Sequence, residues 1–136
     1  MRRESLNFSP SLGWDDVKTP MVCKFDNEDK YLLYAGFRGV VTAATLKQGG
    51  ADNPTRDIRF QDDTPVTSLA VFKGDKNTCF VAANTAGEIA IYNFDVFREM
   101  KRISNPNREV CFVEVSKQSA QIVAGLDDGS VRHCLT

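Results

Sequence analysis

The sequence lacks any long apolar run. No stretch approaches the roughly 20 consecutive apolar residues that a membrane-spanning helix needs. The two arginines near the start are not followed by an apolar segment of signal-peptide length. We therefore expect a protein without membrane contact that lies inside the cell, in the cytoplasm or the nucleus.

An excess of either charge is also missing, because 17 basic residues face 18 acidic ones. Such a balance gives no strong field toward nucleic acid or a membrane surface. The basic residues that do gather are Arg56, Arg59, Arg98, Lys101, Arg102 and Arg108. They are interleaved with Asp57, Glu99 and Glu109, which predicts a solvated edge of mixed charge. Protein partners are therefore expected, and a nucleic-acid-associated protein is an alternative.

Residues that bind metals are few and scattered. The four cysteines are Cys23, Cys79, Cys111 and Cys134, and no two lie two to four residues apart. Each sits in an apolar, strand-like run, which predicts small buried thiols rather than disulfides. His133 is the only histidine and directly precedes Cys134, so in a strand the two side chains point to opposite faces. We expect no metal site.

Catalytic motifs are missing as well. No Gly-x-Ser-x-Gly sequence surrounds a nucleophile, and the Gly49-Gly50 pair precedes no helix that could bind phosphate. The acidic pairs Asp15-Asp16, Asp62-Asp63 and Asp127-Asp128 lie in expected loops and turns, where Asp bonds its own backbone. The sequence favours a protein that is not an enzyme and has no cofactor, with a fragment of an enzyme as the alternative.

A hairpin pattern occurs three times. Each occurrence has an apolar run, a small residue, a glycine four positions later and an alternating run. The three segments are Tyr31–Leu46, Cys79–Phe94 and Gln121–Thr136, with the glycines Gly39, Gly87 and Gly129. Glycine supplies the positive φ that a tight hairpin turn requires. The sequence therefore predicts three antiparallel hairpins.

Further strand-like runs flank the hairpins. Apolar runs at 21–25, 66–72 and 109–115 precede them, and polar runs at 56–61 and 98–104 follow the first two. Val22, Val66 and Val110 repeat at a spacing of 44 residues. The polar runs predict exposed edge strands, and strand is favoured over helix for 93–103.

Together these runs predict an all-β fold of eleven strands. Repeated units of about 40–45 residues with four strands each are typical of β-propeller blades. We expect three such blades of antiparallel strands, at about 21–61, 66–104 and 109–136, preceded by an N-terminal arm over 1–20. The third blade lacks its outer strand, and three blades leave the ring incomplete.

Over roughly residues 20–136 the chain resembles the WD-repeat β-propeller family. The resemblance is carried by Val66, Ser68 and Leu69 at the start of the second unit, by the Asp128-Gly129 turn, and by Tyr92-Asn93 in the place of the Trp-Asp pair. The chain departs from the pattern at Arg38 and Ala86, which replace the turn aspartate. No Gly-His precedes a unit, so the family's buried hydrogen-bond network is absent. A lactonase-like propeller is the alternative family.

The missing blades have three possible sources. A second copy, a different chain or further sequence of the same polypeptide would each complete the ring. Residues 4–8 of the arm could provide the outer strand of the third blade in another copy. His133 is expected to point inward, where a buried imidazole needs a hydrogen-bond partner, and a neighbouring chain could supply it.

The resemblance implies a rigid, non-enzymatic scaffold for protein assembly within a complex. Its contact surface would consist of the turns within the hairpins and the connections between units, at 62–65 and 105–108. The candidate partner-binding residues are Phe37, Arg38, Thr85, Arg108 and Asp127, with Trp14 in the arm. Exposed aromatic and arginine side chains carry much of the binding energy at interfaces, which favours Phe37 and Arg38.

Overall fold

A computed structural model describes residues 20–26, 30–46, 55–60, 64–73, 77–116 and 121–135. They form eleven strands and no helix. The strands are β1 (Pro20–Phe25), β2 (Tyr31–Gly36), β3 (Val40–Thr45), β4 (Thr55–Arg59), β5 (Val66–Lys73), β6 (Thr78–Asn84), β7 (Glu88–Asn93), β8 (Arg98–Ser104), β9 (Val110–Val115), β10 (Gln121–Leu126) and β11 (Val131–Leu135). Trp14 and residues 4–8 lie outside the described residues.

The strands pair in chain order into three antiparallel sheets, and the predicted all-β class is confirmed. We call β1–β4 sheet one, β5–β8 sheet two and β9–β11 sheet three. The hairpin turns contain Gly39, Gly87 and Gly129 at φ values of 72°, 83° and 85°. These left-handed conformations explain the glycine in each repeat, because an L side chain rarely adopts them.

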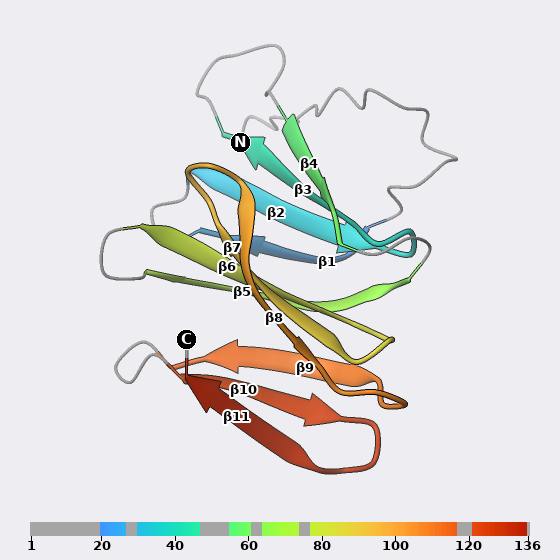
Figure 1. The fold of residues 1–136 in the computed structure, drawn as a ribbon. Coiled ribbons are helices and arrows are strands. Elements are labelled where there is room, and N and C mark those ends of the chain that lie inside the picture. The colour runs from blue at the N-terminus through green and yellow to red at the C-terminus, as the bar shows by residue number, and fades with distance from the viewer. Residues whose placement is uncertain are drawn as a thin grey trace, which may run out of the picture.

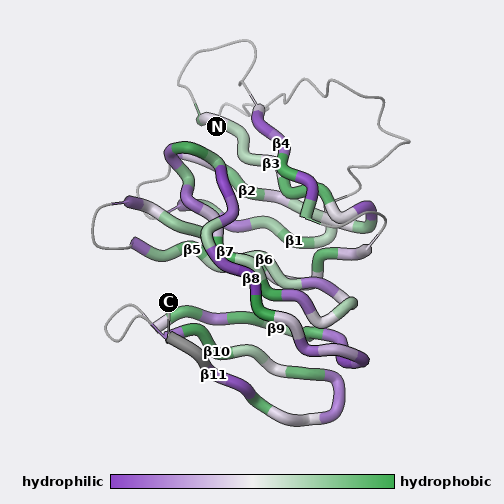
Figure 2. Tube along the Cα trace, viewed as in Figure 1, coloured by the Kyte–Doolittle hydropathy of each residue, from purple (hydrophilic) through white to green (hydrophobic). Residues whose placement is uncertain are grey.

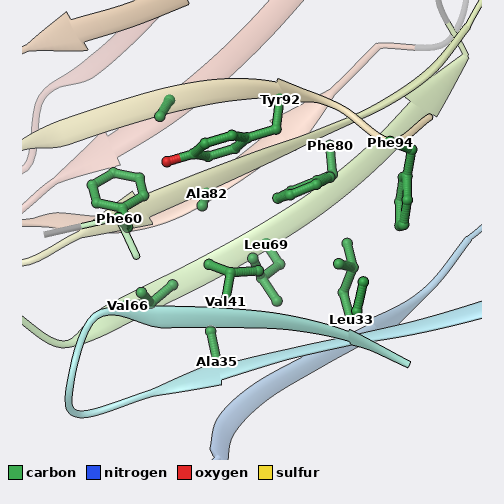
Figure 3. Close-up of a cluster of buried hydrophobic side chains, with 12 residues drawn as sticks. Leu33, Ala35, Val41, Phe60, Val66, Leu69, Phe80, Ala82, Tyr92 and Phe94 are labelled. Atoms are coloured by element: carbon green, nitrogen blue, oxygen red, sulfur yellow. The ribbon is translucent and has the colours of Figure 1, made fainter. Parts of the chain in front are cut away.

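The three sheets stack face to face, with sheet two in the middle (Figure 1). Strand β5 lies next to both β1 and β9, so the first strands of the sheets are neighbours. One apolar cluster fills the space between sheets one and two, and Figure 3 shows Leu33 and Val41 facing Leu69 and Phe80 there. A second cluster, which includes Val81, joins sheets two and three. Sheet two is thus covered on both faces.

The fourth strands β4 and β8 are exposed, as their polar sequences predict. Figure 2 shows hydrophilic stretches along both. Two of their arginines nevertheless bridge sheets. Arg56 donates to the carbonyl oxygen of Phe94 at 2.8 Å and lies over the Phe97 ring. Arg102 donates to the carbonyl oxygen of Phe60 at 3.1 Å, so the basic edge is partly a contact between sheets.

Two expectations about burial are wrong. Cys79 is buried as predicted, but Cys23 and Cys111 are exposed; none of the three forms a disulfide. The side chain of His133 is also exposed rather than inward. The reason is the same in each case. Alternation identifies the two faces of a strand, but whether a face is buried depends on the sheet that covers it.

Candidate protein-interaction edge

The hairpin turns and the connection between sheets two and three lie along one side of the stack, where β2, β6 and β10 end, at the right in Figure 1. We call residues 37–39, 85–87, 105–109 and 127–130 the loop edge. The turns of sheets two and three are tied to the start of their own sheets in the same way. Thr85 donates its backbone N–H to the carbonyl oxygen of Pro65 at 3.1 Å, and Asp127 donates to that of Glu109 at 3.0 Å. The repeat therefore sets the position of the turns.

The middle turn, between β6 and β7, is fixed by a buried amide. Asn84 is fully buried, and its side-chain oxygen accepts the backbone N–H groups of Ala86 at 3.0 Å and Glu88 at 2.9 Å. A side chain that satisfies the backbone of a turn favours one conformation of it. The surface of this turn is therefore preorganised.

The same turn anchors the connection to sheet three. The carbonyl oxygen of Gly87 accepts the backbone N–H of Asn105 at 2.8 Å and its side-chain N–H at 3.2 Å. The two segments approach so closely that a Cβ at position 87 would lie 2.0 Å from the carbonyl oxygen of Asn105. Gly87 is thus required by space as well as by φ, and the connection is held against the turn.

An ion pair joins this connection to the β10–β11 turn. Arg108 Nε lies 3.5 Å from a carboxylate oxygen of Asp128. The other oxygen accepts the backbone N–H and the hydroxyl of Ser130 at 2.9 and 2.6 Å. These hydrogen bonds, with a smaller contribution from Arg108, hold the pKa of Asp128 below its usual value. The carboxylate therefore stays ionised, and the β10–β11 turn has an ordered polar tip.

A cleft of about 220 Å³ opens between the connection and the β10–β11 hairpin. It is lined by Ser104, Asn105, Pro106, Arg108, Leu126, Asp128 and Arg132. Two guanidinium groups and one carboxylate give it a polar wall, while Leu126 supplies an apolar surface. Guanidinium groups bind carboxylates with paired hydrogen bonds. The cleft is suited to an acidic side chain of a partner.

The structure brings some of the predicted residues together and separates others. Arg108 and Asp127 lie on adjacent parts of the loop edge, and both are exposed. Thr85 is half-buried on the middle turn. Phe37, whose exposed fraction is 52%, and the exposed Arg38 lie on the turn of sheet one, away from the cleft. Trp14 lies outside the described residues.

Sequence reasoning missed the residues that organise this edge. Asn84, Asn105 and Arg132 were not among the candidates. Asn84 could have been found, because an asparagine that ends an apolar strand before a glycine turn is a frequent turn-stabilising residue. The roles of Asn105 and Arg132 depend on contacts between two sheets, which no local pattern contains.

The described residues bring no three His, Cys, Asp or Glu side chains close enough together to hold a metal ion. In the same part of the chain, no helix is long and apolar enough to cross a membrane. Neither the protein-family models nor the curated proteins compared with this chain match it.

Proposed function

We propose that the three sheets are consecutive blades of a β-propeller and that the chain is a WD-repeat-like scaffold without catalytic activity. The order of the strands supports the blades, since each sheet is a meander of neighbouring antiparallel strands. The stacking supports them too, because the first strands β1, β5 and β9 lie side by side along the stack. The sequence resemblance to the family points to the same fold.

Within this proposal the loop edge is the surface that binds a protein partner. The observation that carries the proposal is the preorganisation of the edge by Asn84 and Asn105 next to a cleft walled by Arg108 and Arg132. A surface that is already ordered loses little conformational entropy on binding. An acidic segment of a partner would place its carboxylates in the cleft, and Phe37 would provide a separate apolar contact.

Affinity capture from the source cells, followed by binding of the purified partner, tests the loop edge. One variant combines Arg108→Ala with Arg132→Ala, a second is Phe37→Ser, and the control is Val96→Ser. Val96 is 66% exposed and lies on the β7–β8 turn, on the side of the stack opposite the loop edge. A partner retained by the wild type and the control should bind the double variant about tenfold more weakly or worse. Equal binding of all variants would refute the loop edge as the docking surface.

A further inference from the structure

The outer face of sheet three has apolar residues at positions whose equivalents in sheets one and two are buried. We call the side of each sheet that points along the stack from sheet one to sheet three its front face, and the opposite side its back face. In the three aligned hairpins, Val123 and Val131 occupy the positions of Val81 and Ile89 in sheet two. They also occupy the positions of Leu33 and Val41 in sheet one. The repeat therefore places apolar residues at the same two positions on the front face of every sheet.

On sheets one and two, the next sheet does cover them. Leu33 and Val41 pack against sheet two, and Val81 and Ile89 pack against sheet three. On sheet three the corresponding face is open: Val131 is 60% exposed and Phe112 is 46% exposed. Phe112 and Val131 share this face because both pair with Gly125 across the sheet. Apolar side chains exposed together on a sheet face indicate an interaction surface.

The matching half of such a junction is present at the other end of the chain. On the back face of sheet one, Cys23 and Phe25 are exposed along β1; they pair with Tyr34 and Leu32, on either side of Leu33, which faces sheet two. By strand register, Cys23 stands at the position of Leu69 and Val113, which are both buried at the two existing junctions. Phe25 stands at the position of Val71 and Val115, which pack against the same two clusters. Val40, Thr42 and Ala44, farther out on this face, are already buried. The surface open for contact is therefore the first strand.

We propose that the front face of sheet three binds the back face of sheet one in a second copy of this chain. The proposal rests on the proposed blade arrangement and names one of its possible completions. Two copies joined head to tail at both junctions would close with twofold symmetry. Together they supply six sheets, within the roughly four to eight blades of known propellers.

The junction between sheets two and three shows what the new contact would look like. There the Thr67 hydroxyl donates to the carbonyl oxygen of Val110, and the backbone N–H of Val113 donates to the Ser68 hydroxyl at 3.0 Å. By strand register, Cys111 stands at the position of Thr67, Pro20 at that of Val110 and Cys23 at that of Val113. The new junction therefore brings Cys111 of one copy next to Pro20 of the other, with Cys23 close by.

Light scattering on the purified 136-residue chain, with circular dichroism for folding, tests the junction. We expect a folded species of twice the 15.1 kDa chain mass. Val131→Asp on the front face and Phe25→Asp on the back face should each weaken dimerisation about 100-fold or more, because each buries an unpaired carboxylate. Val96→Asp makes the same change at an exposed site on neither face and should leave the dimer intact.

Mixing the two disruptive variants distinguishes a head-to-tail dimer from dimers that use other contacts. The Val131→Asp chain keeps an intact back face and the Phe25→Asp chain keeps an intact front face, so a mixture should regain one junction and form a mixed dimer. Mild oxidation of the wild type should give a crosslink between Cys111 and Cys23, identified by mass spectrometry of the linked peptides. A Cys111–Cys111 crosslink would instead reveal two front faces in contact.

The proposal is overturned by a folded chain that stays monomeric at every concentration tested, by a chain that does not fold alone, or by a dimer that resists either substitution. The first two results would assign the covering sheet to another polypeptide. None of these results bears on the loop edge, which lies on a different surface and is tested by partner capture with the Arg108 and Arg132 variant.

Discussion

Sheets two and three have the same strand pattern but different surroundings. In sheet two, Ile89 is 2% exposed because sheet three covers it, whereas Val131, at the same position of sheet three, is 60% exposed. The turns differ in the same way, since Gly87 is packed against the connection to the next sheet and Gly129 has open space around it. The repeat therefore specifies which faces are apolar, and the neighbouring sheet decides which of them are buried.

The largest difference in the free energy of unfolding should come from substituting the equivalent apolar residues Ile89 and Val131. Ile89→Ala should lower the free energy of unfolding by about 2–5 kcal/mol, because it leaves a cavity between sheets two and three. Val131→Ala should lower it by about 0.5 kcal/mol or less in the monomeric chain, since the side chain is mostly exposed there. Urea unfolding followed by circular dichroism, at dilutions where the chain is monomeric, measures both. Equal losses would contradict the packing of sheet two against sheet three.

The second-largest difference in stability should come from Gly→Ala substitutions in the two turns. Gly129→Ala should cost about 1–2 kcal/mol, which is the ordinary penalty for a left-handed L residue. Gly87→Ala should cost clearly more, because its Cβ would also displace the backbone of residues 105–108. Both values come from urea unfolding. In addition, Gly87→Ala should weaken partner binding at the loop edge, because it displaces residues 105–108, which include Asn105, Pro106 and Arg108 of the cleft wall.

A smaller difference in stability should come from Asn84 and Asp128, the side chains that bond the backbone of the two turns. Asn84→Ala should cost about 1–3 kcal/mol, because it leaves two backbone N–H groups of a part-buried turn without their acceptor. Asp128→Ala should cost much less, because its carboxylate and the Arg108 guanidinium are solvent-screened. Thermal unfolding of both variants measures the contrast. A larger loss for Asp128→Ala would mean that the β10–β11 turn, rather than the buried amide, organises the edge.

The smallest effect is expected from the junction between sheets one and two. The hydroxyl of Tyr92 is buried there and forms no hydrogen bond of normal geometry with another described residue, so Tyr92→Phe should leave stability unchanged or raise it by up to about 1 kcal/mol. Burial, reinforced by the negative charge of Glu99, raises the pKa of Tyr92 to about 12. Because this pKa lies above the unfolded value of 10, stability should fall as the pH rises from 10 to 12.

The pH dependence distinguishes Tyr92 from other titrating groups. Tyr92→Phe should flatten the loss of stability between pH 10 and 12, measured by urea unfolding at each pH. Tyr34→Phe should also flatten part of this loss, because burial raises the pKa of Tyr34 as well. An unchanged slope in Tyr92→Phe would show that its hydroxyl is not in a buried environment.

The strands were predictable because their signals are local. An apolar run, a glycine and an alternating run are enough to identify a hairpin, and the outer strand β8 begins and ends where its polar sequence predicts. The exposure of Cys111 and His133 was not predictable, because it depends on whether a further sheet covers the front face of sheet three. The bridging roles of Arg56 and Arg102 also depend on contacts between sheets that lie about 40 residues apart in the sequence.

In the proposed dimer, the front face of sheet three and the back face of sheet one are two halves of one junction. Amide hydrogen exchange, followed by mass spectrometry at protein concentrations below and above dimerisation, tests it most directly. We expect peptides from β1 and from β9–β11 to gain protection together at the higher concentration, while peptides from β6 and β7 do not change. Protection that is independent of concentration, or that rises only in sheet two, would contradict it.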